Sequence, residues 1–264
     1  MTRKCWLCLR TVLLAWALLF IPSLQAHSQV AVRYTEGVIH GFLVLRALDG
    51  NTLAQGELEQ VARGERVTSH LVLRFKDGSI HEETVVYSQQ LDFHVLSYRL
   101  LQKGRAFKVP MEMKIDGSTG QVTVQYTDND GKEEIESERL ELPPDLANGI
   151  IPVLLKNIPP GAKQTTVSLV AASPKPRLVK VVITPNGEAK FLAGGSIRKA
   201  TQYLIKYEIG GIAGWLAPLV GKQPQDSHAW VLGGDAPAFV RLEGPLFLGG
   251  PSWRIELASP VWQG

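Results

Sequence analysis

The sequence predicts a mainly β protein: an antiparallel meander that forms a strongly curved sheet or open barrel, with one or two short helices. Three observations support this fold class. Turn-forming dipeptides recur at short intervals, the segments between them alternate apolar and polar residues, and the stretch from residue 32 to residue 142 leaves no room for a helix of any length. Parallel βαβ units are therefore excluded.

The turn signals are dipeptides of Asp or Asn followed by Gly. This combination favours hairpin turns, because glycine adopts a positive φ without strain. They are Asp49-Gly50, Asp77-Gly78, Asp116-Gly117, Asp130-Gly131 and Asn186-Gly187. Each lies between segments rich in β-branched, aliphatic and aromatic residues, so a hairpin is expected at each.

Segment 67–76 shows the strand pattern most clearly. Its odd positions carry mostly apolar side chains, and its even positions are polar except for Val72. This period of two is typical of a strand with one buried face and one wet face. Similar segments predict eight strands before residue 142, at 32–45, 53–61, 67–76, 80–87, 93–101, 106–115, 122–126 and 133–140.

The meander is interrupted by the proline pair at 143–144, which ends the last of these strands. Apolar residues then recur at helical spacing, so a helix is expected over 146–157 with Asp145 as its cap. Gly149 and Pro152 weaken that helix and are expected to kink or split it. Further strands are expected at 165–172, 177–184, 189–192, 199–209, 228–232, 238–243 and 253–257, with a short apolar helix or turn at 215–220.

Residues 1–28 have the order of a secretory signal peptide. Three basic residues precede the apolar run 11–21, and Ala26 and Ser28 supply small residues for cleavage. The alternative is an uncleaved anchor, but the run is short of the roughly 20 residues that a bilayer span needs. We therefore expect a periplasmic or secreted protein whose mature chain, 29–264, is a single curved antiparallel β domain.

Both cysteines, Cys5 and Cys8, lie inside the expected signal, so the mature chain would have no disulfide, thiolate metal site or cysteine nucleophile. The whole chain holds 28 Lys+Arg and 25 Asp+Glu. Three of these basic residues and none of the acidic ones lie in 1–28, so the mature chain carries 25 of each. A zero net charge argues against nucleic acid and against purely electrostatic membrane binding.

The C-terminal region carries a resemblance. It reads Asp-Ser-His-Ala-Trp-Val at 226–231, Pro-Ala-Phe-Val-Arg-Leu-Glu-Gly at 237–244 and Trp-Arg-Ile-Glu-Leu at 253–257. This resembles a group of secreted bacterial proteins of unassigned function, which is in turn similar to the periplasmic lipoprotein-carrier half-barrel of LolA and LolB. The resemblance implies a concave face that holds acyl chains. The lipid-attachment cysteine of LolB is missing, so LolA is the closer analogue, and no ligand-contact residue carries over.

Motifs for metal binding or nucleophilic catalysis are weak. His81 and Glu83 share one strand face and offer two ligands, fewer than a metal site needs, so a solvated face is the simpler interpretation. Asp226, Ser227 and His228 have the residue types of a catalytic triad, but adjacent strand residues point to opposite faces. No cofactor and no metal ion is expected.

Two further clusters have structural interpretations. The glycines of 210–214 miss the spacing of a phosphate-binding turn and indicate a bend. Glu134, Glu136 and Glu138 share a strand face, where they are expected to form a solvated edge that discourages strand-to-strand aggregation. A calcium site is the alternative for these acids.

Aromatic residues gather near the C-terminus, where Trp215, Trp230, Trp253 and Trp262 lie within the last 50 residues. Core packing is the default role of aromatics, but a curved open sheet also offers a concave apolar face for a ligand. The candidate ligand-binding residues are Trp215, Trp230, His228, Phe239 and Arg241.

The sequence therefore favours an exported, non-enzymatic envelope protein that binds or relays an apolar ligand such as a lipid. One alternative is a hydrolase of an envelope ester or glycan, with its site near His228. Another is an interaction module that binds another envelope protein through a sheet edge. The expected partners are thus an apolar small molecule or lipid, or an envelope protein, and not nucleic acid; the oligomeric state stays open.

Overall fold

The computed structural model describes residues 29–128, 130–193, 196–208 and 224–258. In these residues the chain forms the helix α2 (Ile151–Asn157) and fourteen strands. The strands are β1 (Ile39–Ala47), β2 (Thr52–Arg63), β3 (Arg66–Phe75), β4 (Ile80–Gln89), β5 (Phe93–Lys103), β6 (Met111–Asp116), β7 (Gln121–Thr127), β8 (Glu133–Arg139), β9 (Thr165–Val170), β10 (Leu178–Ala193), β11 (Ser196–Glu208), β12 (Ser227–Leu232), β13 (Ala238–Pro245) and β14 (Ser252–Leu257). The mainly β, antiparallel fold class is confirmed.

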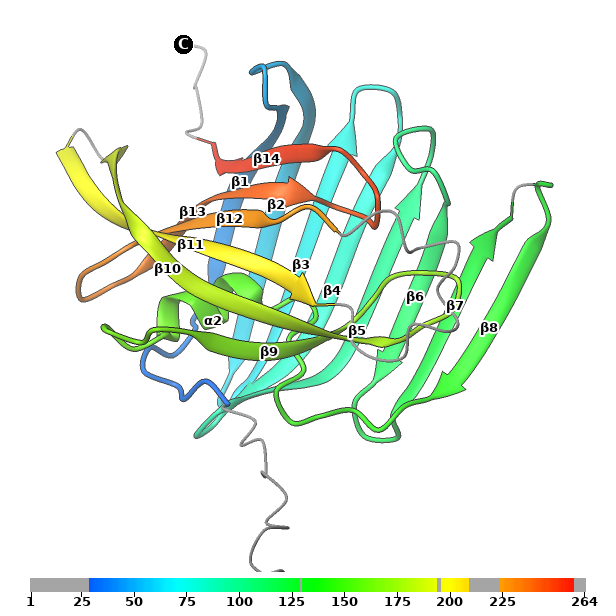
Figure 1. Ribbon diagram of the computed structural model, residues 1–264, viewed down its shortest axis with the longest axis horizontal. Coiled ribbons are helices and arrows are strands. Elements are labelled where there is room, and N and C mark those ends of the chain that lie inside the picture. Colours follow the sequence, from blue (N-terminus) through cyan, green and yellow to red (C-terminus); the bar gives the residue numbers. More distant parts are fainter. Residues whose placement is uncertain (1–28, 129, 194–195, 209–223, 259–264) are drawn as a thin grey trace, which may run out of the picture.

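All fourteen strands belong to one sheet (Figure 1). Its order is β8-β7-β6-β5-β4-β3-β2-β1-β14-β13-β12-β11-β10-β9, and β1 pairs with β14 antiparallel. Two meanders, the N-terminal arm β1–β8 and the C-terminal arm β9–β14, are thus joined at β1 and β14. Strands β8 and β9 are the two ends of this order, so the sheet is curved and open rather than a closed barrel.

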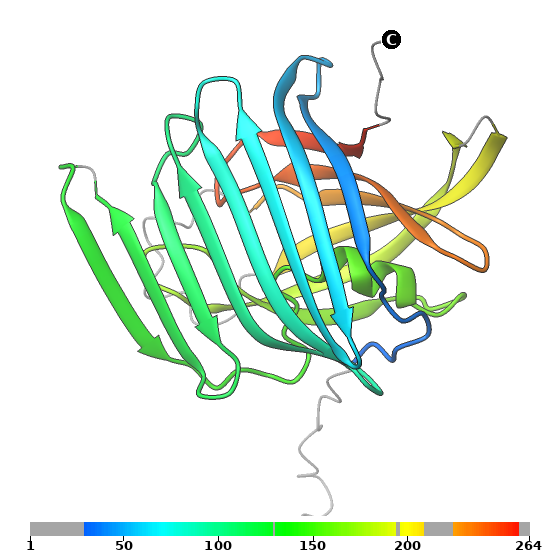
Figure 2. The ribbon, with the colours of Figure 1, turned by 180° about the vertical axis from the view of Figure 1, so that it is seen from behind.

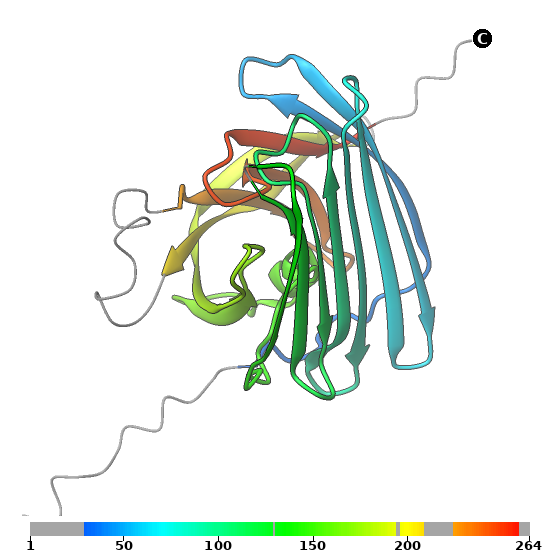
Figure 3. The same ribbon diagram turned by 90° about the vertical axis from the view of Figure 1, so that its right-hand side faces the viewer.

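The two arms face each other with α2 between them, as Figure 3 shows, and Figure 2 shows the N-terminal arm from its outer side. One buried cluster combines Val85 of β4, Leu154 of α2 and Val181 of β10. We call the sheet face that carries this cluster the inner face, and the opposite one the outer face. The interior is therefore filled partly by a helix rather than by strand side chains alone.

Aspartates fix the turns of the N-terminal arm. In four hairpins an Asp carboxylate accepts a hydrogen bond from the backbone N–H two residues later, at 2.9 Å in each case. The bond from Ser79 lowers the pKa of Asp77 below its ordinary value, and hydrogen bonds from the hydroxyl and the backbone N–H of Ser118 lower that of Asp116. The donating residues are Asn51, Ser79, Ser118 and Asp130. Four of the five expected hairpins are confirmed. The sequence could predict them because short-range bonding of this kind depends only on neighbouring residues.

The fifth expected hairpin is wrong. Asn186-Gly187 lies inside β10, which continues to pair with β11 on both sides of it. The register shifts between Pro185 and Glu188, and Gly187 has a φ of 100°. The glycine therefore serves a β-bulge, and the two strands expected at 177–184 and 189–192 are one long strand.

The helix is shorter than expected and is not capped by Asp145. It begins at Ile151, and its N-cap residue Ile150 makes no side-chain capping bond. Gly149 has a φ of 75°, which is incompatible with a continuing helix. The preceding backbone instead pairs with β9: Ala147 donates to the carbonyl of Ser168 at 2.8 Å. No helix of the described residues is both long and apolar enough to cross a membrane.

Two other strands begin later than expected. Strand β6 starts at Met111, directly after Pro110, and the preceding chain forms a turn in which Ala106 donates to the hydroxyl of Ser79 at 3.0 Å. Strand β1 starts at Ile39. The expected signal 1–28, the glycines of 210–214 and the apolar segment 215–220 lie outside the described residues.

Candidate functional site

The inner face encloses a pocket where the two arms approach each other. Its volume is about 220 Å³, and we call it the central pocket. The N-terminal arm contributes Leu100 of β5 and Met113 of β6, and the C-terminal arm contributes Leu169 of β9 and Val179 of β10. Alternation on each strand positions these side chains, because residues of one parity share the inner face.

The rest of the lining comes from chain segments at the pocket rim. The loop between β9 and β10 and the loop between β13 and β14 both border it. Most of these side chains are apolar, and the charged residues among the described lining are Glu83 and Arg177. The rim residues are Asn148, Val170, Ala171, Ala172, Ser173, Arg177, Pro224, Pro245, Leu246, Phe247, Leu248 and Gly249. The pocket is thus apolar with a small number of polar groups, the usual composition of a small-molecule site.

Glu83 is held by a chain of buried polar groups. The Nε2 atom of His81 lies 3.0 Å from Oε1 of Glu83, and the His81 side chain is 2% exposed. The Gln102 amide nitrogen lies 3.1 Å from Nδ1 of His81 and donates to the carbonyl of Leu246 at 2.9 Å. Because a carbonyl only accepts, this fixes the amide orientation. His81 Nδ1 therefore accepts, and its Nε2–H donates to Glu83.

Two tyrosines complete the polar groups of the pocket. Burial raises the pKa of Tyr98 well above its ordinary value of 10, and the electrostatic effect of the neighbouring Glu83 and a hydrogen bond with it raise this pKa further. Burial also raises the pKa of Tyr207, whose hydroxyl lies 3.2 Å from Oγ of Ser227. Both phenols therefore stay neutral at physiological pH, and they add hydroxyl groups to a mostly apolar wall beside Glu83.

A buried asparagine fixes the rim. Asn148 donates to the carbonyl of Val170 at 2.9 Å and accepts from the N–H of Val170 at 2.8 Å. The side chain thereby satisfies both backbone groups at the end of β9, where the strand leaves the sheet. The pocket wall at Val170 is consequently held in one position.

A second hollow, of about 570 Å³, lies at the turn end of the N-terminal arm. Its lining includes Arg66, His94 and Ser118 and is more polar than that of the central pocket. His94 already lies 3.3 Å from the Gln29 amide nitrogen. The central pocket is the better candidate site because most of its lining is apolar and both arms contribute to it.

The ligand-binding residues expected from the sequence lie elsewhere. Trp230, His228 and Arg241 come together on the outer face of the C-terminal arm. The Arg241 guanidinium lies 5.5 Å from the Trp230 ring centre, and the His228 ring lies 6.2 Å from the same ring. Arg241 also forms an ion pair of 2.5 Å with Glu256. A cation–π contact, a tilted ring contact and an ion pair thus occupy this cluster.

Phe239 is half-buried and pairs in register with Val231 of the neighbouring strand, and Trp215 lies outside the described residues. None of the described four lines the central pocket. Their role in ligand binding stays a prediction. Trp253 packs on the inner face against Phe75, with ring centres 5.5 Å apart, as a core residue.

The residues near His228 do not form a triad. Ser227 is buried beside Tyr207, and His228 turns to the other face, where its Nδ1 atom lies 3.3 Å from the Gln202 amide nitrogen. Asp226 lies 3.9 Å from the Lys206 amine. The prediction that these neighbours point apart is confirmed.

Two interpretations of charged clusters have different outcomes. The edge position is confirmed: β8 ends the sheet, Glu136 is exposed, and Glu134 and Glu138 are half-buried. Their effect on aggregation stays a prediction. The prediction of a solvated face at His81 and Glu83 is wrong, since the His81 side chain is only 2% exposed. The sequence held a signal for this, because Val85 and Tyr87 have the same parity on the strand and therefore share its buried face.

Together, the fold and the pocket define an open β-barrel-like protein with an apolar hollow between its two arms. No protein-family model and no curated protein matches the sequence. Among solved structures, the chain is similar to a beta-barrel-like protein of Domain of Unknown Function DUF1849 from Brucella abortus. The two share 11% sequence identity at a TM-score of 0.43, over 86% of this chain and 97% of the other.

Proposed function

We propose that this chain is an exported, non-enzymatic envelope protein that binds or relays an apolar ligand such as a lipid, in the manner of the LolA-like half-barrel carriers that it resembles. The observation that carries the proposal is the central pocket, which both arms line with apolar side chains. When an apolar group replaces water in an apolar hollow of a folded protein, the free energy of the system falls, and this favours binding.

The size of the pocket supports a ligand with a narrow apolar part. A volume of about 220 Å³ suits a segment of an acyl chain or a small ring system rather than a whole phospholipid. Two loops, at 171–177 and 246–251, border the rim, and they leave a route by which the rest of a larger ligand reaches solvent. We propose that the apolar part enters between the loops 171–177 and 246–251.

Glu83 supplies the polar contact in this proposal. Its side chain is 25% exposed, and His81 orients one of its oxygens. A ligand group that donates a hydrogen bond, such as a hydroxyl or an ammonium, would meet the carboxylate at the pocket wall. We therefore propose an amphiphile with a donor group as the ligand class.

The test is native mass spectrometry of the protein purified from its exported form, followed by binding of the uncharged fluorescent probe N-phenyl-1-naphthylamine. Leu169→Trp fills the pocket and should weaken probe binding at least tenfold. The matched control is Leu178→Trp on the adjacent strand, where the side chain is exposed, and it should bind as the wild type does. Absence of any co-purifying ligand together with absence of saturable probe binding would overturn the proposal.

A further inference from the structure

A row of metal-binding residue types crosses three strands on the outer face of the N-terminal arm. His40 of β1 pairs in register with Glu59 of β2, and Glu59 pairs in register with His70 of β3. Directly opposed residues on antiparallel strands point to the same face, with Cβ atoms roughly 5 Å apart. The sheet therefore holds an imidazole, a carboxylate and a second imidazole side by side.

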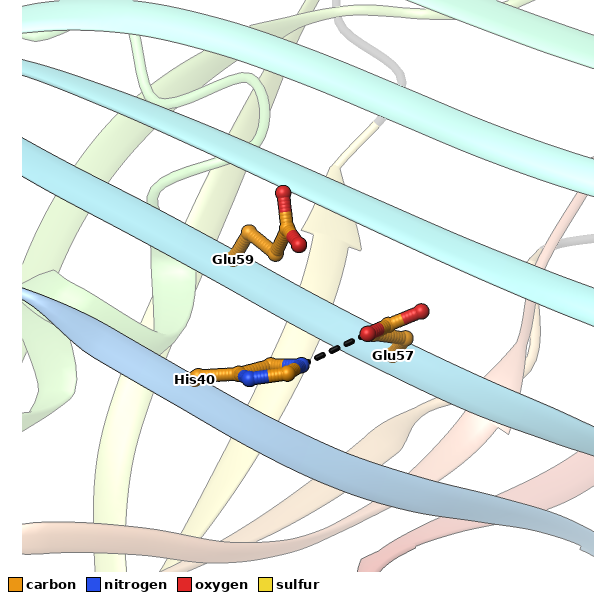
Figure 4. Close-up of side chains that lie close together, drawn as sticks. All are labelled: His40, Glu57 and Glu59. Carbon is orange, nitrogen blue, oxygen red and sulfur yellow. Dashed lines mark hydrogen bonds and ion pairs between the residues drawn. The ribbon is translucent and has the colours of Figure 1, made fainter.

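A second carboxylate joins the row from the same strand as Glu59. Glu57 lies two residues earlier on β2 and so on the same face. The Nε2 atom of His40 lies 2.6 Å from Oε1 of Glu57 (Figure 4). One ligand atom from each of His40, Glu57 and Glu59 lies within 4.8 Å of the others. Ligands of tetrahedral zinc are roughly 3.4 Å apart, so small side-chain rotations of these exposed residues close the difference.

His70 is placed to supply the fourth ligand. Its Nε2 atom lies 3.1 Å from Oε1 of Glu82, and its side chain is 38% exposed and able to turn. Glu82 keeps a second partner if His70 leaves, because Arg99 lies 3.4 Å from the same oxygen. Turning His70 toward Glu59 thus exchanges one exposed contact for a metal bond.

We propose that His40, Glu57, Glu59 and His70 bind one divalent transition-metal ion, with zinc as the best-fitting class. Two imidazoles and two carboxylates are ligands that zinc accepts in four-coordinate sites. The ion joins β1, β2 and β3 on the outer face. The site is separated by the sheet from the central pocket and does not depend on the proposed ligand.

The first experiment is calorimetric titration of the chelator-treated protein with zinc chloride. One ion per chain is expected. His40→Ala, Glu59→Gln and His70→Ala should each weaken binding at least tenfold, and His94→Ala, a histidine of the same arm outside the row, should keep the wild-type affinity. Zinc affinity that is unchanged by His40→Ala or by His70→Ala would overturn the proposal.

The second measurement keeps the test sharp if a variant folds poorly. X-ray absorption spectroscopy of the zinc-loaded wild-type protein should show two imidazoles among its nitrogen and oxygen ligands. Thermal melting of the metal-free variants should match that of the metal-free wild type, because all four side chains lie on the outer face. A zinc spectrum with one imidazole or none would contradict the proposed ligand set.

Discussion

Lys156 of α2 forms an ion pair with Glu36 in the segment that precedes β1, with Nζ 2.5 Å from Oε1. Both side chains are largely buried, at 13% and 4% exposure. Gln60 donates to the second carboxylate oxygen at 3.0 Å, and the Glu36 backbone N–H donates to Gln89 at 2.6 Å. The pair ties the first described segment and the helix to the inner face of the N-terminal arm.

Replacing one partner of this pair should destabilise the protein strongly. Lys156→Met leaves the Glu36 carboxylate buried without its counter-charge, which is expected to cost about 3–5 kcal/mol in the free energy of unfolding. Denaturant unfolding measures this loss. The control is Lys180→Met, which breaks an ion pair with Glu208 whose side chains are 50% and 53% exposed, and it should change stability by less than about 1 kcal/mol.

A double variant checks the cause. Glu36→Gln in the Lys156→Met background removes the unpaired charge, so the protein should regain part of the lost stability. If the second substitution destabilises the protein further by its full separate amount, the unpaired charge is not the reason for the loss.

Alkaline pH should destabilise the fold through its buried tyrosines. Burial raises the pKa of Tyr87, Tyr98, Tyr203 and Tyr207 above 10. In the unfolded chain these phenols ionise near pH 10, so their stabilising contribution is complete below that pH and is lost as the pH rises above it. The expected loss is about 1.4 kcal/mol per pH unit for each tyrosine that stays neutral in the fold.

The measurement is the urea midpoint between pH 8 and pH 11.5. Tyr98→Phe removes one of the four phenols, so the slope above pH 10 should become shallower. A slope that is the same in the variant and the wild type would show that Tyr98 does not contribute.

Asn148 should be essential for the pocket rim. Asn148→Ala leaves both the N–H and the carbonyl of Val170 without their buried partner. The expected loss of stability is about 2–4 kcal/mol, from two unsatisfied backbone groups. Hydrogen exchange at the Val170 amide should become faster, whereas the exposed Asn51→Ala should leave that exchange unchanged. Equal exchange in Asn148→Ala and wild type would contradict the assigned role.

Local signals in the sequence predicted the strands well, because alternation and Asp-Gly turns depend on neighbouring residues. The same kind of dipeptide failed at Asn186-Gly187, where long pairing with β11 imposes a bulge instead. Likewise, Gly149 and the pairing of Ala147 with β9 shorten the helix. In both places a tertiary partner overrides the local preference.

The site was harder to predict than the strands. Alternation tells which face of a strand is buried, but not which distant strand lies across from it. The pairing of β1 with β14 brings the two arms together, and no local pattern encodes it. Core packing, the default role of the aromatic residues near the C-terminus, is correct for Trp253. Glu83 and Leu169 line the same pocket only because the strand order brings the two arms together, which the local pattern does not encode.

The glutamates of β8 should protect the free edge of the N-terminal arm. Glu136 and Glu138 pair in register with Val124 and Val122 of β7, so uncharged strand-forming residues in their place would leave the open edge beside the apolar inner face without its charges. The double substitution of both glutamates by Thr should leave the melting temperature nearly unchanged and lower the soluble fraction. Light scattering measures the aggregation. Substitution of both by Lys keeps a charged edge and should remain soluble; aggregation of the Lys variant would point to a different cause.

Glu83 should determine which amphiphiles bind in the central pocket. In Glu83→Gln the amide oxygen still accepts the hydrogen bond from His81, so the wall keeps its shape and loses its negative charge. A charge-assisted hydrogen bond contributes about 1.5–3 kcal/mol, so dodecylammonium should bind the variant at least about tenfold more weakly than the wild type. Dodecanol, which needs only an acceptor, should bind both proteins with similar affinity. Calorimetry of the two ligands with the two proteins separates charge from shape, and an equal loss for both ligands would mean that Glu83 supports the wall rather than contacts the ligand.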